Sequence, residues 1–348
     1  MTDWFKSILE WIYGVVGSYG IAVMIFTVMF RVILTPFEVS SRKGMRKMAA
    51  IQPKLNELQK KYANDQAKLQ QKQSELMRKE HYNPLSGCLP MLLQWPILMI
   101  MFYAMRDVAS EKLIGQAISL LTGETPKYES FLWIKNVFMA DSPFTAIAPD
   151  ANGLIAAGQG VWQGVFNGLS ELQKTNLLAA VQQYVPAAAG LGFEEVFNFA
   201  SSATLSTTIN TYVMPALQQI PAYVADVAAV PGWKNVGFLL FSVTLFQNFN
   251  GLLILPLLSG VTQWAMTKFN PATQQQPQPA GQQKGMGNFM TWFFPIFSVF
   301  ICLSSNAGFA LYWVTINIFA TVQSILINKY LESKDAKQKA LTEGNTAK

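Results

Sequence analysis

Arg31 is the residue of this sequence that most strongly indicates a functional site. It lies inside the apolar run Ser18–Phe37, which contains no Asp or Glu. A cation at membrane depth is costly, so it tends to face water or a partner and marks a functional site. No later run long enough to cross a bilayer supplies a carboxylate. We therefore expect water, backbone carbonyls, lipid phosphate or an acidic group of another molecule beside Arg31, in a polar hollow within a membrane.

The position of Arg31 also allows a second interpretation. Arg31 lies six residues before Phe37, the last residue of the run, which is roughly 9 Å of helix. Its long side chain could extend from there to the lipid headgroups. Both interpretations place the charge in the inner half of the bilayer.

Other polar side chains lie in the apolar runs as well. Thr27, Arg31 and Thr35 are spaced four residues apart and so share one face of a helix. The later runs contain Gln94, Thr262, Gln263, Ser298, Thr315, Asn317, Thr321, Gln323 and Ser324. Hydrogen bonds between helices, worth about 0.6 kcal/mol each on average, would explain single residues of this kind. They do not explain Arg31, whose burial at a span centre costs about 2.5–3.5 kcal/mol.

The sequence offers no set of residues for catalysis or metal binding. His81 is the only histidine, and the two cysteines, Cys88 and Cys302, lie within or at the edge of apolar runs. We interpret the cysteines as small packing residues and not as a disulfide framework. A phosphate-binding G-x-x-x-x-G-K-[ST] loop is also missing. We therefore expect no enzyme activity, no metal and no cofactor.

The composition predicts an all-α integral membrane protein. Of the 348 residues, 51% are apolar and 13% are charged, about half the charged fraction of a typical soluble domain. A membrane-spanning helix needs about 20 mainly apolar residues. Five segments fit this requirement: 18–37, 84–105, 250–268, 288–304 and 308–328. The last two form one apolar stretch, which we expect to break at Ser304–Gly308 and to form a tight hairpin.

The basic residues predict the orientation, because Lys and Arg accumulate on the cytoplasmic side of a membrane. The loop 38–83 carries eleven Lys or Arg against five acids. The stretch 106–235 carries six against ten, and the tail after Asn328 carries five against three. We therefore expect an external N-terminus and a cytoplasmic C-terminus. No cleavable signal with a basic first region is visible.

The remaining segments connect the predicted spans. Residues 1–17 are expected to form an amphipathic helix that lies flat on the external surface, the alternative being an extension of the first span. The others are an external loop with a helical insert at 106–249, a cytoplasmic loop at 269–287 and a cytoplasmic tail at 329–348, in which we expect the polar residues 331–348 to be disordered. In the insert, Gly160, Gly164 and Gly168 recur every four residues, which suits close helix packing.

Residues 38–83 are predicted to form a cytoplasmic coiled-coil hairpin. Apolar residues follow a heptad spacing on both sides of the turn-prone Ala63-Asn64-Asp65, namely Met48, Ile51, Leu55, Leu58, Tyr62, Leu69 and Leu76. The basic residues expected on the outer faces include Arg42, Lys43, Arg46, Lys47, Lys60, Lys61, Arg78 and Lys79. They could dock lipid headgroups, RNA or a targeting factor. The alternative is a solvated face that only follows the positive-inside bias.

Several patches, in the right order along the chain, resemble the YidC-type membrane protein insertases. Phe30–Pro36 resembles the end of the family's first span. Asn83–Pro90, followed by Gln94-Trp95-Pro96, resembles the start of its second span. Gly308–Trp313, with Asn317 and Gln323, resembles the last span. Phe131–Ile134 resembles the external loop, and Leu255–Thr262 resembles the third span less specifically. The resemblance extends over roughly residues 1–140 and 250–330, which leaves the long insert near 144–248 outside it.

The resemblance implies five membrane helices around a hydrophilic groove that opens to the cytoplasm and to lipid. Arg31 would line this groove, and Tyr312 and Trp313 would contact the client's segment. The expected groove residues are Arg31, Thr27, Thr35, Gln94, Tyr312, Trp313, Thr315 and Asn317. The form expected is the short bacterial one, in the plasma membrane and without a large N-terminal external domain.

The resemblance also implies partners. Newly made membrane proteins and the lipid bilayer come first, and a Sec-type translocon, the ribosome and signal-recognition targeting factors are further candidates. We expect no specific nucleic-acid partner. Two other functions stay open: a small-anion transporter in which Arg31 binds the anion, and a non-catalytic assembly scaffold that uses the insert.

Overall fold

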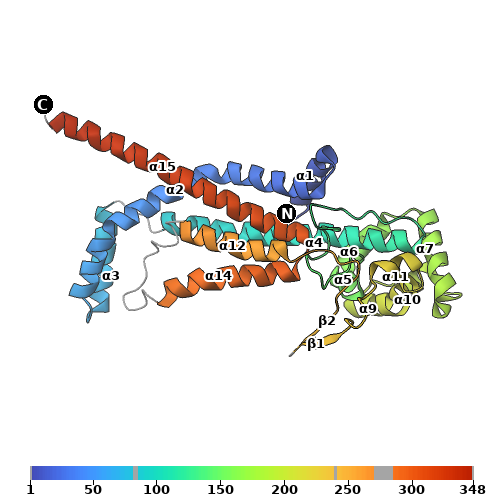
Figure 1. The fold of residues 1–348 in the computed structure, drawn as a ribbon. Coiled ribbons are helices and arrows are strands. Elements are labelled where there is room, and N and C mark those ends of the chain that lie inside the picture. The colour runs from blue at the N-terminus through green and yellow to red at the C-terminus, as the bar shows by residue number, and fades with distance from the viewer. Residues whose placement is uncertain (1, 81–84, 239–240, 270–284, 347–348) are drawn as a thin grey trace. The chain divides into compact units, whose positions relative to one another are not determined.

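The computed structural model describes residues 2–80, 85–238, 241–269 and 285–346, and helices dominate them (Figure 1). The long helices are α1 (Thr2–Val16), α2 (Tyr19–Lys61), α3 (Gln66–Lys79), α4 (Leu85–Leu121), α12 (Ile254–Phe269), α14 (Gly285–Ser304) and α15 (Ala307–Thr346). The short helices are α5 (Ala151–Ala156), α6 (Gln159–Asn167), α7 (Glu171–Tyr184), α8 (Phe193–Val196), α9 (Ser202–Thr208), α10 (Met214–Leu217) and α11 (Pro221–Asp226). The sheet described is a single antiparallel pair, β1 (Val236–Phe238) and β2 (Phe241–Val243). The predicted all-α class is confirmed.

The chain divides into two compact units. The first contains Met1–Ile25, Ile100–Leu257 and Phe300–Tyr312. The second contains Phe26–Met99, Leu258–Val299 and Trp313–Lys348. Several long helices therefore contribute residues to both units.

In the first unit, α5 to α11 and the end of α4 form a separate hydrophobic core, which we call the insert core. Its buried residues include Ile114, Leu120, Leu154, Trp162, Leu177, Val181, Leu205, Ile209 and Leu217. The Trp162 indole donates a hydrogen bond of 2.8 Å to the carbonyl of Leu154, so its one polar atom is paired. Asp150 caps α5, and Ser170 forms a capping box with Gln173 at the start of α7.

The glycine spacing in the insert has a different role from the one predicted. Gly160 and Gly164 are exposed, and an added Cβ at either would meet nothing within 4 Å. Gly168 follows the last residue of α6 as its C-cap. The prediction of a small-residue packing stripe is therefore wrong: α6 packs through Trp162 and Phe166 on another face.

A buried polar network joins the loops that enter and leave the insert. Asn136 is fully buried and donates to the Ile147 carbonyl at 2.8 Å and to Gln116 at 3.0 Å. Asn250 accepts from the Asn136 amide at 2.7 Å and donates to the carbonyls of Asn136 and Ala140 at 2.9 Å each. The Asp141 carboxylate accepts from the amides of Leu252 and Leu255 at 2.7 Å each, so it also neutralises the N-terminus of α12. An added Cβ at Gly251 would lie 2.0 Å from that carboxylate, so glycine is required there.

The N-terminal helix is separate from the first predicted span. α1 ends at Val16, and Gly17 adopts a φ of +69°, a conformation that favours glycine. α2 then begins at Tyr19. Phe5, Leu9 and Ile12 are the buried side of α1, whereas Trp4, Trp11 and Val15 are exposed.

In the second unit, α2 continues without a break through the predicted first span into the first arm of the hairpin. It contains Pro36 and Pro53, each of which leaves the carbonyl four residues earlier without its helical hydrogen bond. Met48, Ile51 and Leu55 are buried and pack against Leu76 and Met77 of α3. The predicted turn is present, with Asp65 capping α3 through the Lys68 amide at 3.0 Å.

The end of the chain differs from the prediction. α15 continues to Thr346, so the prediction of a disordered tail at 331–348 is wrong for the residues described. Leu331 on this extension is only 3% exposed. The predicted break between the last two apolar segments is confirmed, because α14 ends at Ser304 and α15 begins at Ala307.

Among the described residues, two helices are long and apolar enough to cross a bilayer, by length and composition alone. They are Tyr19–Lys61 and Ala307–Lys337, and Thr291–Ser304 is a shorter apolar helix. Pro84, the first residue of the predicted second span, lies outside the described residues, and α4 extends beyond the predicted end of that span to Leu121. The third begins at Ile254 and not at Asn250, because residues 244–253 form a loop.

Candidate functional site

Polar side chains of α2, α12, α14 and α15, most of them predicted to line a polar hollow, are buried in the second unit. Thr27 is 1% exposed and Asn317 is 3% exposed. Ser259, Ser298, Thr262, Gln323 and Ser324 are also buried. A set of buried hydroxyls and carboxamides at this density requires internal partners or water, since hydrocarbon offers neither.

Two hydrogen bonds join helices across this polar side. The Gln323 carboxamide donates to the Thr35 hydroxyl at 2.8 Å, which links α15 to α2. The Asn317 carboxamide donates to the Thr262 hydroxyl at 3.4 Å, which links α15 to α12. The Thr35 hydroxyl in turn donates to the Arg31 carbonyl at 3.1 Å. The bonds therefore place α15 between the two other helices.

Arg31 is half-buried on α2, one turn before Thr35 and one turn after Thr27. The helix thus presents Thr27, Arg31 and Thr35 along one face, as their spacing predicted. Thr315 and Trp313 are half-buried at the start of the second unit's part of α15. Tyr312 is buried in the first unit, and the side chain of Gln94 lies outside the described residues.

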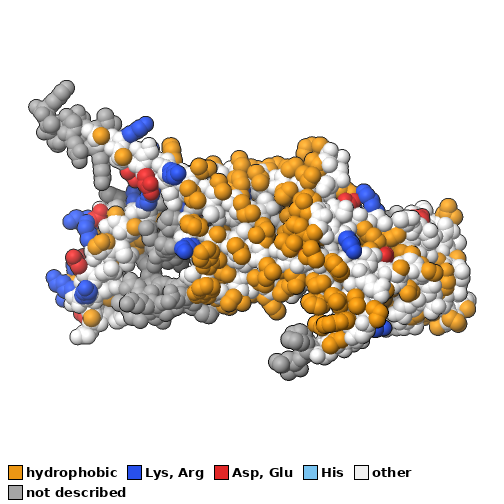
Figure 2. All heavy atoms as spheres, viewed as in Figure 1, with side chains coloured by type: hydrophobic (Ala, Val, Ile, Leu, Met, Phe, Trp, Pro, Cys, Tyr) orange, Lys and Arg blue, Asp and Glu red, His pale blue; other side chains and the backbone are white. Residues whose placement is uncertain are grey.

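The outer side of the same helices is apolar. Its exposed residues are Val28, Val32, Ile33 and Phe37 on α2, Val261 on α12, Trp292 and Ile296 on α14, and Ile318, Val322, Ile325 and Leu326 on α15. Figure 2 shows hydrophobic side chains crowding the surface over these helices, with Lys and Arg gathered near α3. A group of helices with polar residues inside and apolar residues outside is stable in lipid and not in water.

Close helix packing supports this arrangement at Gly260 of α12. An added Cβ there would lie 2.6 Å from a Val299 methyl and 3.3 Å from the Pro295 carbonyl, both on α14. Small residues allow membrane helices to approach each other in this way. α12 and α14 are therefore held together by backbone proximity.

Two of the predicted docking residues are not exposed on the outer face of the hairpin. Arg42 is buried, with an ion pair of 2.8 Å to Glu38 and a hydrogen bond of 3.4 Å to Asn328 of α15. Arg46 is half-buried and donates to Asp335 at 2.8 Å and to the Asn328 carbonyl at 3.0 Å. Arg42 is thus unavailable for docking, because it is buried and its guanidinium is bonded to Glu38 and to Asn328 of α15. The i, i+4 spacing of Glu38 and Arg42 was the available signal for this pair.

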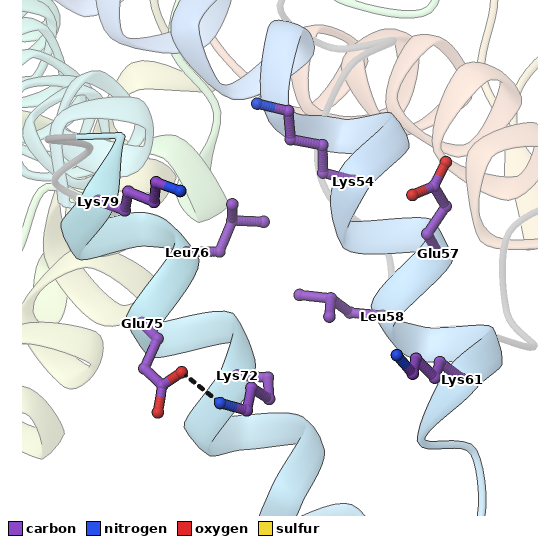
Figure 3. Close-up of a pocket in the computed structure, with 8 residues that line it drawn as sticks. All are labelled: Lys54, Glu57, Leu58, Lys61, Lys72, Glu75, Leu76 and Lys79. Atoms are coloured by element: carbon purple, nitrogen blue, oxygen red, sulfur yellow. Dashed lines mark hydrogen bonds and ion pairs between the residues drawn. The ribbon is translucent and has the colours of Figure 1, made fainter.

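The other six predicted docking residues are exposed: Lys43, Lys47, Lys60, Lys61, Arg78 and Lys79. Near the tip of the hairpin, α2 and α3 enclose a groove of about 390 Å³. Figure 3 shows Leu58 and Leu76 pointing toward each other across it, between Lys54, Lys61, Lys72 and Lys79. Hydrogen bonds from Lys72 and Lys54 hold the pKa values of Glu75 and Glu80 below their usual range.

Comparison with known proteins identifies the class. The chain matches the family model described as 60Kd inner membrane protein over residues 11–216 and 207–335. Since this covers nearly the whole chain, the protein belongs to that family, and it is an all-α membrane protein.

Individual relatives match over shorter stretches. A membrane protein insertase of Chlorobium limicola is 36% identical over 135 residues, 39% of this chain and 21% of the relative. Insertases of Clostridium tetani and Fusobacterium nucleatum are 35% identical over 131 residues and 36% identical over 141 residues. These alignments span 53% and 60% of the two relatives and 38% and 40% of this chain. The chain thus spans only about a fifth to three fifths of the relatives it matches.

Proposed function

We propose that this protein is a membrane protein insertase that moves hydrophilic tails of clients across one leaflet and releases their apolar segments into lipid. The observation that carries the proposal is the burial pattern of the second unit, which is the reverse of that in a water-soluble protein. Thr27, Asn317 and Gln323 are buried inside, and the outer surface is apolar. Its matched relatives are membrane protein insertases, which supports the same activity.

The mechanism follows from desolvation. A charged client tail loses its hydration when it enters a bilayer, which is the main cost of insertion. The polar faces of α2, α12 and α15 would replace part of that hydration. Arg31 would attract tails that carry Asp or Glu. The apolar segment then moves into lipid, at a gain of about 25 cal/mol per Å² of apolar surface buried.

We also infer the orientation and partners. The loop 38–83, with eleven basic residues against five acids, favours a cytoplasmic hairpin and an external insert. The exposed residues Lys43, Lys47, Lys60, Lys61, Arg78 and Lys79 would dock a cytoplasmic partner. Targeting factors, the ribosome and a Sec-type translocon are the candidates. The five membrane segments would be those predicted from the sequence.

The role of Arg31 can be tested with clients that differ only in tail charge. Arg31→Ala should slow insertion of an acidic-tailed client about tenfold, as expected for loss of a charged hydrogen-bond donor, and a neutral-tailed client should be less affected. Arg31→Lys should retain most activity on both. The matched control is Lys334→Ala, an exposed cation of α15 that is not among the proposed docking residues. Equal performance of Arg31→Ala and the parent on both clients would contradict the charge role.

A further inference from the structure

The insert contains a cleft that the proposed insertase activity does not use. It lies between α6, the first turns of α7 and the segment 193–200, and its volume is about 350 Å³. The residues that line it are Gln163, Phe166, Asn167, Lys174, Phe193, Glu194, Phe197, Asn198, Phe199 and Ala200. All of them belong to the first unit.

The floor of the cleft is aromatic and rigid. Phe166, Phe197 and Phe199 are only 3–6% exposed, and Phe193 is half-buried beside them. Ring centroids lie 5.2 Å apart for Phe166–Phe197, 5.0 Å for Phe166–Phe199 and 4.9 Å for Phe193–Phe197. Trp162 stacks on Phe199 at 5.2 Å from below, in the insert core. The floor is thus preformed, and an occupant would not have to order it.

The rim of the cleft is polar and almost uncharged. Gln163 donates to the Phe199 carbonyl at 3.1 Å, and Asn198 accepts from the Ala200 amide at 3.1 Å, which fixes both carboxamides. Asn167 is exposed at the end of α6. The two charged lining residues are of opposite sign, and Lys174 already pairs with Glu171 at 2.8 Å. This balance does not favour an anionic headgroup or a nucleic acid.

We propose that this cleft binds an extended, uncharged peptide segment that inserts one aromatic or large aliphatic side chain. Carboxamides donate and accept at adjacent atoms, as peptide groups do, so Gln163, Asn167 and Asn198 suit a peptide backbone. The apolar floor suits an anchor side chain, the usual energetic centre of such sites. A neutral oligosaccharide is the competing occupant, because its hydroxyls could also bond to the carboxamides of the rim.

Binding of a defined peptide to the full chain in nanodiscs tests this assignment. The probe is a blocked, fluorescently labelled decapeptide of Gly, Ser and Asn with one central Phe, and its partner probe has Ala in place of Phe. The Phe peptide should bind at least tenfold more tightly, since burial of one large apolar side chain is worth about that factor or more. Competition by chitotetraose is measured in the same titration.

Two matched substitutions locate the site. Asn167→Trp places a bulky ring on the rim without altering the buried floor and should weaken the Phe peptide at least tenfold. Asn176→Trp changes an exposed asparagine of α7 that does not line the cleft and should leave binding unchanged. Both should melt as the parent does and insert a charged-tail client normally, which separates this inference from the proposed function. Equal binding of the Phe and Ala peptides, displacement by chitotetraose, or unchanged binding in Asn167→Trp would overturn it.

Discussion

The insert and the membrane-facing part of the second unit use opposite designs. In the insert, Trp162, Leu177 and Leu205 are at most 1% exposed, whereas polar residues such as Gln163 and Asn198 lie outside. In the second unit, Thr27, Asn317 and Ser324 are buried, whereas Ile296 and Leu326 are more than 60% exposed. The burial patterns therefore fit two different solvents: water around the insert, and lipid around the membrane-facing helices of the second unit.

The largest effect should come from the insert core. Trp162→Ala removes a fully buried ring and leaves the Leu154 carbonyl without its hydrogen bond, so it should destabilise the insert by about 3–5 kcal/mol. Hydrogen exchange in α5–α7 would measure the loss. Trp233→Ala is the control, because Trp233 is 49% exposed and its removal should cost under about 0.5 kcal/mol. Equal protection in both variants would contradict a packed insert core.

A matched pair of aspartates tests the difference in solvent directly. Ile296 of α14 and Leu172 of α7 are 68% and 70% exposed, so neither change disturbs a core. Ile296→Asp should cost about 2.5–3.5 kcal/mol, because the carboxylate would enter hydrocarbon. Leu172→Asp should be neutral within about 0.5 kcal/mol. Denaturant titrations in bilayers would measure both, and a harmless Ile296→Asp would mean that α14 does not face lipid there.

The contact between α2 and the helical tail should have an intermediate effect. Arg42→Met leaves Glu38 without its ion-pair partner and Asn328 without its donor, at a cost of about 1–3 kcal/mol. We expect faster proteolysis of α15 beyond Asn328, followed by mass spectrometry. Lys43→Met, at an exposed neighbouring position, should leave the cleavage rate unchanged. A tail equally protected in both variants would show that Arg42 does not hold it.

The smallest effect is a pH dependence at the end of the hairpin. The 2.6 Å hydrogen bond from Lys54 holds the pKa of Glu80 below its usual value of 4.5. The pair therefore stabilises the hairpin above about pH 4.5, and this contribution is lost as the pH falls through the folded-state pKa. The protection factors of α3 amides against hydrogen exchange should fall over that interval in the parent. In Lys54→Met the same step should be weaker, and an identical step would contradict the assignment.

The sequence predicted the elements that depend on local pattern. The all-α class, the break after Ser304, the turn at Asn64 and the seam of Met48, Ile51 and Leu55 all follow from periodicity and turn residues. The shared face of Thr27, Arg31 and Thr35 follows from helical spacing in the same way.

The features that the sequence did not predict depend on contacts between residues far apart in the chain. The tail reads as disordered by composition, yet it is helical, with Arg46 paired to Asp335 from 289 residues away. The network of Asn136, Asp141 and Asn250 joins segments about 110 residues apart. The glycines of α6 mimic a packing stripe, because spacing alone does not reveal which face of a helix meets a neighbour.

Insertion by this chain alone can be measured by protease protection. A single-span client with an acidic tail is added to liposomes that contain only the purified chain. If the chain inserts clients by itself, a protected fragment should appear well above the level of empty liposomes, and less of it with Arg31→Ala. Protection no greater than in empty liposomes, with the protein folded and oriented with its hairpin accessible, would contradict insertion by this chain alone.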